Sequence, residues 1–270
     1  MQLGIHIRTM GESSTREIVT AAARAADECP AVSDVWIPDH IAIPPDDAEG
    51  SGGRYLDPLA TLAYLAALTS RVRIGTSVLV LPYRPALPTA KAIATIQELS
   101  DGRVVLGIGV GWMQAEFRAV GVDYGRRGRI SDEVLDFLDR CFANEVVEAN
   151  GQPFLFKPRP ARPALFIGGA PERAFRRVLR HRAGWMPFGM TPDKLRGPIA
   201  DLRTQAADGG LPPPEVAVVT SLPTSDATAA RDLVAAYAAA GVGRVIHGAR
   251  YADFDGFKRG LDAVSAAARG

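Results

Sequence analysis

Short runs of β-branched and apolar residues alternate along the chain with longer segments whose apolar positions recur at helical spacing. A period of two residues is typical of a strand, and a period of 3.6 is typical of a helix. The short runs predict strands at 3–8, 34–39, 72–81, 104–110, 164–168, 184–188, 216–221 and 244–247. The longer segments predict helices at 15–28, 58–68, 88–99, 130–142, 172–182, 192–207, 228–240 and 254–268.

This order of elements predicts an α/β fold, a (β/α)8 TIM barrel formed as a single domain over residues 1–270. A doubly wound open sheet is the structural alternative, and the eight units favour the barrel. The stretch 145–163, with prolines at 153, 158, 160 and 163, does not fit the alternation. We interpret it as an inserted excursion that lies over the barrel.

Composition excludes several classes of protein. The chain is 47% hydrophobic with a formal net charge of +1, so nothing in the totals points to nucleic acid or an anionic membrane as a partner. The two cysteines form no metal motif, and no apolar stretch approaches the roughly 20 residues of a membrane span. The N-terminus lacks the features of a signal peptide, so a cytoplasmic enzyme acting on a small molecule is expected.

The fourth strand carries a row of glycines. Side chains alternate along a strand, so Val104, Leu106, Ile108 and Val110 face the outer helices, and Gly107, Gly109 and Gly111 face the lumen. Glycine in a strand marks a close approach to the backbone. Three in register predict a lumen cleared for a flat ligand; tight packing against a bulky neighbour is the alternative. A dinucleotide fingerprint fails because Trp112 stands where its last glycine is needed.

Polar residues lie at the ends of two other strands, where barrel enzymes place their active sites. Asp39 and His40 follow the second strand, and a histidine there can exchange a proton near neutral pH. The alternative for Asp39 is a loop cap. Thr76 and Ser77 lie within the apolar third strand, where their hydroxyls need either a ligand or ordinary buried hydrogen bonds.

The fifth strand runs into Gly168, Gly169 and Ala170, ahead of a helix that starts with Pro171. Backbone amides at such a helix start suit a phosphate, while a plain turn is the alternative. The segment 157–182 holds eight Lys or Arg against one acid, Glu172. That excess would attract a polyanion, although we interpret most of the arginines as a solvated face of the helix.

Taken together, these motifs resemble the luciferase-like monooxygenase superfamily, particularly its branch that uses coenzyme F420. The resemblance runs along nearly the whole chain and rests on 36–40, 75–78, 107–112, 124–132, 163–170 and 183–187. It implies a bacterial luciferase-like barrel with F420, or alternatively FMN, bound at its C-terminal mouth. Family members are often dimers, which makes a homodimer a candidate assembly.

The resemblance also implies roles for particular residues. His40 and Asp39 would be catalytic and lie near the reactive face of the cofactor, with His40 as proton donor or acceptor. A non-prolyl cis peptide bond between Ser77 and Val78 would support the back of the ring. The implied cofactor-binding residues are Thr76, Ser77, Val78, Gly107, Gly109, Gly111, Trp112, Gly168, Gly169 and Ala170, and no metal is implied.

One departure from the family pattern concerns a glutamate that some F420-dependent dehydrogenases carry directly after the fourth strand. Here the stretch 110–112 occupies that place and Glu116 comes later, so sugar-phosphate dehydrogenation is not implied. The hypothesis is hydride transfer between F420 and a small organic substrate, supported by the basic segment 157–182. Its rivals are an FMN-dependent monooxygenase and a barrel that binds the cofactor without catalysis.

Overall fold

The computed structural model describes residues 1–269. Within them, one sheet of eight parallel strands runs in the order β8-β7-β4-β3-β2-β1-β10-β9. Its strands are β1 (Gln2–His6), β2 (Asp34–Ile37), β3 (Arg73–Val80), β4 (Val104–Gly109), β7 (Ala164–Gly168), β8 (Gly184–Met186), β9 (Ala217–Thr220) and β10 (Arg244–His247).

The two outer strands of that order, β8 and β9, meet and close the sheet. Parallel bridges join Trp185 to Val216 and Phe188 to Val219, and the amide of Val219 donates to the carbonyl of Pro187 at 3.1 Å. The structure is therefore a (β/α)8 barrel, as predicted, and the open-sheet alternative is wrong.

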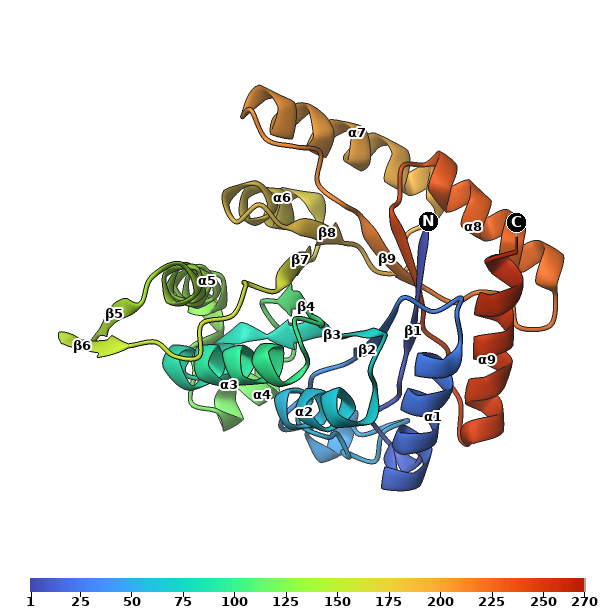
Figure 1. Ribbon diagram of the computed structural model, residues 1–270, viewed down its shortest axis with the longest axis horizontal. Coiled ribbons are helices and arrows are strands. Elements are labelled where there is room, and N and C mark those ends of the chain that lie inside the picture. The colour runs from blue at the N-terminus through green and yellow to red at the C-terminus, as the bar shows by residue number, and fades with distance from the viewer. Residues whose placement is uncertain (270) are drawn as a thin grey trace.

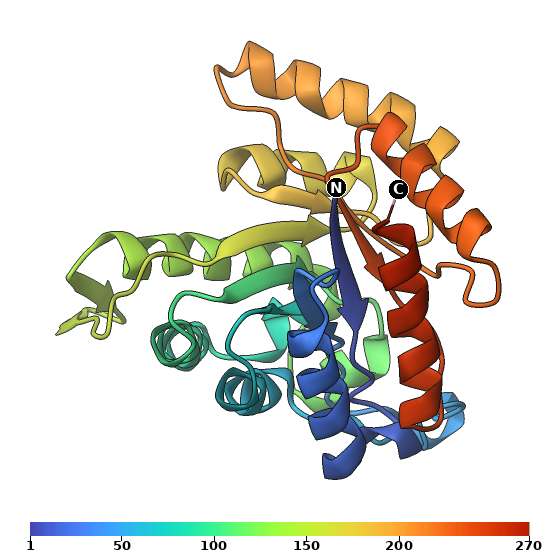
Figure 2. The ribbon, with the colours of Figure 1, turned by 45° about the vertical axis from the view of Figure 1, so that its right-hand side comes forward.

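Helices surround the barrel on its outer side (Figures 1 and 2). They are α1 (Arg16–Glu28), α2 (Pro58–Leu68), α3 (Ala86–Leu99), α5 (Arg127–Ala143), α6 (Pro171–Arg180), α7 (Pro192–Asp208), α8 (Ala227–Ala239) and α9 (Phe254–Ala267). A short helix, α4 (Gln114–Ala119), follows β4, and 3-10 turns form at η1 (Glu12–Ser14), η2 (Pro45–Asp47), η3 (Leu81–Tyr83) and η4 (Tyr124–Arg126). Helix α3 begins before the predicted residue 88 because a proline is tolerated in the first turn. Within residues 1–269, no helix combines the length and apolarity needed to cross a membrane.

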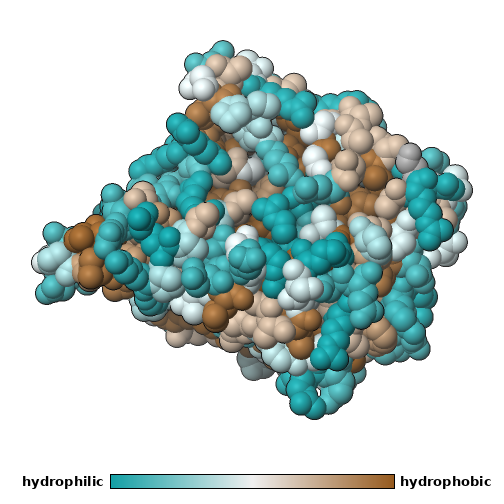
Figure 3. Space-filling model, in the orientation of Figure 1, coloured by the Kyte–Doolittle hydropathy of each residue, from teal (hydrophilic) through white to brown (hydrophobic). Residues whose placement is uncertain are grey.

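The excursion at 145–163 contains an antiparallel hairpin of β5 (Val146–Ala149) and β6 (Gln152–Leu155). It projects beyond α5 at one side of the molecule instead of lying over the barrel, which corrects the expectation (Figure 1). The hairpin follows the C-terminus of α5 and precedes β7, so it leaves from the end of the barrel where strands begin. Apolar atoms gather at this projection in Figure 3, where Val146 and Leu155 are exposed.

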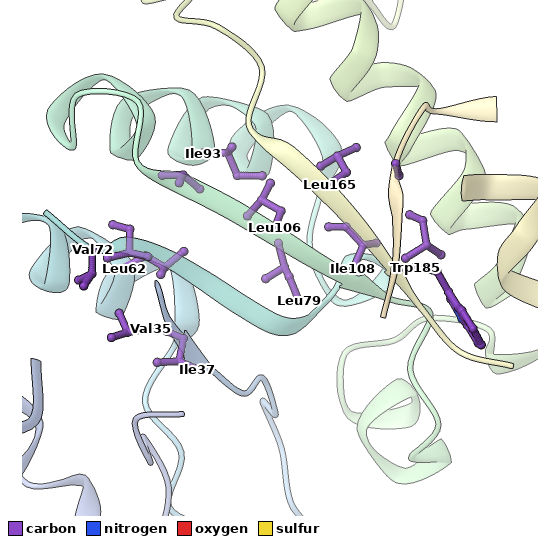
Figure 4. Close-up of a cluster of buried hydrophobic side chains, with 14 of the residues drawn as sticks. Val35, Ile37, Leu62, Val72, Leu79, Ile93, Leu106, Ile108, Leu165 and Trp185 are labelled. Atoms are coloured by element: carbon purple, nitrogen blue, oxygen red, sulfur yellow. The ribbon is translucent and has the colours of Figure 1, made fainter. Parts of the chain in front are cut away.

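Two apolar layers lie on the two faces of the sheet. Leu106 and Ile108 of β4 pack outward with Ile93 of α3, as the alternation predicts (Figure 4). The lumen has its own cluster, formed by Trp36, Val105, Phe166, Met186, Ala217 and Ile246. The middle of the lumen is thus filled by the protein, and a ligand finds space only above it, at the mouth.

A buried ion pair lies below that lumen cluster. The guanidinium of Arg244 bonds the carboxylate of Asp34 and the side chain of Gln2, and both Arg244 and Asp34 have fully buried side chains. Trp36 also donates to Asp34. Burial lowers the pKa of Arg244 to about 10.

Replacing Arg244 by leucine leaves the Asp34 carboxylate buried without its cation. We expect Arg244→Leu to lower the free energy of unfolding by about 3–5 kcal/mol, measured by urea titration. The control is Arg196→Leu, in an exposed pair with Asp193, which should change the value by less than about 0.5 kcal/mol. Equal losses in the two variants would show that the buried pair contributes no more to stability than the exposed pair does.

Candidate active site at the barrel mouth

A cavity of about 290 Å³ opens at the carboxyl ends of β2, β3 and β4. This is the end of the barrel where the chemistry is expected. The cavity is lined by Pro38, Asp39, His40, Ser77, Val78, Val80, Tyr83, Gly111, Trp112 and Phe188. Several of the residues predicted from separate strand ends therefore meet in one place.

The floor of the cavity is a bulge in β3. The peptide bond between Ser77 and Val78 is cis, as the resemblance implies, and the register with β4 shifts between Thr76 and Leu79. The hydroxyl of Thr76 donates to the carbonyl of Gly107 at 2.9 Å, and that of Ser77 bonds Nε2 of His6. Both hydroxyls are thus satisfied inside the protein, and Val78 is the side chain that the bulge presents.

The glycines of β4 differ from the expectation. A Cβ at Gly107 would collide with the carbonyl of Thr76 and approach the Sδ of Met186 to 2.9 Å, and one at Gly109 would collide with Val78. Space at these two positions is taken by protein atoms, so the packing alternative holds there. Gly111, with φ of +80°, lines the cavity itself.

His40 follows β2 and stands at the wall of the cavity with 18% of its side chain exposed. Its Nδ1 lies 2.9 Å from Oε2 of Glu116, a carboxylate in α4 that is fully buried. No residue of the described chain bonds its Nε2. An imidazole held at one nitrogen and free at the other is suited to proton exchange with a ligand.

Glu116 joins three separate segments of the mouth. Its Oε1 accepts from the amides of Ile41 and Ala42 at 2.6 and 2.9 Å, and its Oε2 accepts from the hydroxyl of Tyr83 at 2.7 Å. Burial opposes its ionisation, but these hydrogen bonds and the one from His40 outweigh it and lower the pKa of Glu116 to about 2. It is therefore a carboxylate at any physiological pH.

Asp39 is engaged by a cation of the protein. Its oxygens accept from Arg84 at 2.6 and 2.9 Å and from the amide of Val80 at 2.9 Å, and its side chain is fully buried. Burial raises the pKa of Asp39, while Arg84 acts in the opposite direction. Because both oxygens are occupied, Asp39 anchors the turn after β3 and does not present a free base to the cavity.

Two large aromatic side chains form the open rim of the cavity. Trp112 is 68% exposed and Phe188 is 47% exposed, which is unusual for side chains of this size. The ring of Trp112 meets that of His40 edge to face, with 5.9 Å between centroids. Exposed apolar surface beside a cavity is typical of a ligand-binding site.

The turn predicted to hold a phosphate adjoins the same cavity. Gly168 lies next to Val78 and Phe188, while Gly169 and Ala170 are exposed. Helix α6 begins at Pro171, and no side chain caps its first amides. The amides at this turn are therefore available to an anion.

The basic segment 157–182 is largely neutralised, which corrects the expectation of a free positive excess. Arg176 and Arg177 pair with Asp132 of α5, and Arg180 pairs with Asp136. Arg162 pairs with Asp139 and Lys157 with Glu145. Three of these acids lie in α5 and Glu145 lies just after it, so a count of charges within 157–182 does not include them.

Three residues of the site were not predicted as site residues from the sequence: Glu116, Tyr83 and Phe188. A glutamate directly beside Phe117 on a short helix was a signal, since an acid on a buried face needs partners. Those partners come from other strand ends, so their identity required the fold.

The family model described as luciferase-like monooxygenase matches residues 2–268 of the chain. The chain belongs to the luciferase-like monooxygenase family. A curated member from Mycobacterium tuberculosis (strain ATCC 25618 / H37Rv), named "Uncharacterized protein Rv0953c", is 31% identical over 224 residues, which cover 74% of this chain and 79% of that protein.

Solved structures share the luciferase-like barrel. The monooxygenase RslO1 from Streptomyces bottropensis superposes with a TM-score of 0.76 at 19% identity, covering 100% of this chain and 98% of that one. The oxygenating constituent of 3,6-diketocamphane monooxygenase from Pseudomonas putida, in complex with FMN, gives 0.68 at 16% identity and covers 87% and 71%. An F420-dependent secondary alcohol dehydrogenase with an F420-acetone adduct gives 0.66 at 17% identity and covers 97% and 81%.

Because the pKa of Glu116 is low, we expect its contribution to the stability of this luciferase-like barrel to depend on pH. A folded-state pKa of about 2, below the ordinary 4.5, means that the carboxylate stabilises the fold above about pH 5 and loses that effect as the pH falls toward 2. The difference in free energy of unfolding between wild type and Glu116→Gln should therefore be largest near neutral pH and shrink below about pH 5. Glu133→Gln, in an exposed pair with Arg129, is the control. A pH-independent difference would contradict the assignment.

Proposed function

We propose that this chain is an F420-dependent oxidoreductase that moves a hydride between the deazaflavin and a small organic substrate. The observation that carries the proposal is the His40–Glu116 pair at the wall of the mouth cavity. Hydride transfer to a carbonyl or from an alcohol needs a group that exchanges a proton with the substrate oxygen. We assign this role to His40, which lines the cavity and is held by Glu116.

The residues at the mouth fit a flat cofactor with an anionic end. Val78 offers an apolar floor, and Gly111 lines the cavity with no side chain. The exposed turn at Gly169 and Ala170 offers amides to a phosphate. Bound F420 supplies a carbon that accepts or donates the hydride, and the protein supplies position and proton.

The proton path follows from the hydrogen bonds of the pair. In alcohol oxidation, the substrate hydroxyl gives its proton to Nε2 of His40 as the C–H bond to the carbinol carbon breaks. The carboxylate of Glu116 at Nδ1 then stabilises the imidazolium and holds its orientation. In the reverse direction, His40 returns the proton to the oxygen of the carbonyl.

An FMN-dependent monooxygenase is the second candidate function. It is favoured by the ion pairs of the basic segment, because they leave less free charge for the anionic tail of F420. A barrel that binds the cofactor without catalysis is the candidate from another class. Under it, His40 contributes to ligand affinity alone.

The choice of cofactor is tested by absorbance titration of the protein with F420 and with FMN. We expect F420 to bind with a dissociation constant in the micromolar range and FMN to bind at least about tenfold more weakly. Micromolar FMN binding with no F420 binding would overturn the choice. Oxygen uptake with reduced FMN would then identify the monooxygenase.

The role of His40 is tested by His40→Ala with F420 and a panel of secondary alcohols and ketones. Loss of the proton-transfer group should lower turnover by about 100- to 10,000-fold, while the dissociation constant of F420 changes little. Glu116→Gln should lower turnover less, because Nε2 remains. Tyr64→Phe, on the outside of α2, is the control. Unchanged turnover in His40→Ala would show that another group exchanges the proton, and no turnover in the wild type would favour a purely binding protein.

A further inference from the structure

Arg8 stands at the mouth of the barrel and is not used by the mechanism above. On β1, Gly4 faces Trp36 in the lumen, and His6, two residues later, bonds Ser77 of the bulge. Side chains two residues apart share a face of a strand, so Arg8 follows on the lumen side just beyond the end of β1. Arg8 is half-buried.

Among the residues that the structure describes, no carboxylate pairs with the guanidinium of Arg8. Its Nε donates to the hydroxyl of Ser13 at 3.1 Å, and its carbon lies 5.9 Å from the centroid of the Tyr251 ring. No ion pair joins it to a carboxylate anywhere in residues 1–269. Arg84, at the same mouth, pairs with both Asp39 and Asp57. The terminal nitrogens of Arg8 are thus left to bind something else.

Arg8 is connected to the His40 wall through Tyr55. Met10 and Tyr55 form an antiparallel bridge, and the amide of Leu56 donates to the carbonyl of Thr9 at 2.9 Å. The ring of Tyr55 lies 4.9 Å from that of His40, centroid to centroid. Burial, the neighbouring His247 and the positive charge of Arg8 together lower the pKa of His6 to about 4. The charge of Arg8 also acts on Tyr55. A neutral His6 adds no second positive charge beside Arg8.

We infer that Arg8 binds a carboxylate of the substrate. A guanidinium presents paired N–H donors that match a carboxylate, and a half-buried cation without a partner strengthens such a bond. The substrate class would then be small alcohols or ketones that carry a carboxylate. Anchored at Arg8, the substrate would lie with its reacting oxygen toward His40. This substrate class rests on the proposed function, whereas the binding preference does not.

The test compares matched ketones that differ only in the charged group. The pairs are 4-oxopentanoate with 2-pentanone, and 4-acetylbenzoate with 4-methylacetophenone. Dissociation constants are measured on the full chain without cofactor, by calorimetry at fixed ionic strength. We expect each carboxylate to bind at least about tenfold more tightly than its neutral partner, and Arg8→Gln to remove that difference.

Arg8→Lys should keep part of the preference, since it keeps the charge but loses the paired geometry. Arg196→Gln, an exposed arginine in α7, is the matched control and should keep all of it. Thermal unfolding checks that Arg8→Gln folds as the wild type does. Equal binding of charged and neutral ketones by the wild type, or a preference that survives in Arg8→Gln, would overturn the inference.

Two further outcomes separate this inference from the proposed function. If Arg8→Gln weakens F420 binding and leaves the ketone preference unchanged, Arg8 serves the cofactor and the inference is wrong. If the preference depends on Arg8 but neither F420 nor FMN supports turnover, the anion site stands and the proposed function fails.

Discussion

The buried carboxylate of Glu116 is the interaction on which the mouth of this barrel depends. It takes hydrogen bonds from the loop after β2, from the turn after β3 and from His40, and it comes from the helix after β4. Three strand ends are thereby tied to one charge. A buried carboxylate is stable while all of its hydrogen bonds are made. Loss of one partner leaves a buried oxygen without a hydrogen bond, which destabilises this part of the fold. The hydrogen bonds that hold the mouth together therefore also fix the position of His40.

A second constraint lies between β3 and β4. The bulge at Ser77 and Val78 presses against β4, where only glycine leaves room at Gly107 and Gly109. Met186 and Val78 occupy that room, so the lumen is closed below the bulge and open above it. The floor of the cavity is in this way made by backbone shape and small residues, and its walls by His40, Trp112 and Phe188.

The barrel follows from the sequence because eight alternating units leave few other arrangements, and each strand carries its own period. His40 and the Ser77–Val78 bond also follow, one from its place at a strand end and the other from the family likeness. The partners of Glu116 do not, since they lie 33 to 76 positions away from it. The same limit applies to Gly107: alternation places it toward the lumen, but Met186, which fills the space, comes from another strand. Most of the acids that neutralise the basic segment likewise lie in a separate helix.

We propose that a flat cofactor rests on the Ser77–Val78 bulge with its anionic end at the start of α6. A crystal structure of the chain soaked with F420 tests this most directly. We expect density for the ring against Val78, within reach of Nε2 of His40, and a phosphate at the amides of Gly169 and Ala170. Ring density elsewhere, with the mouth cavity closed by side chains, would contradict it.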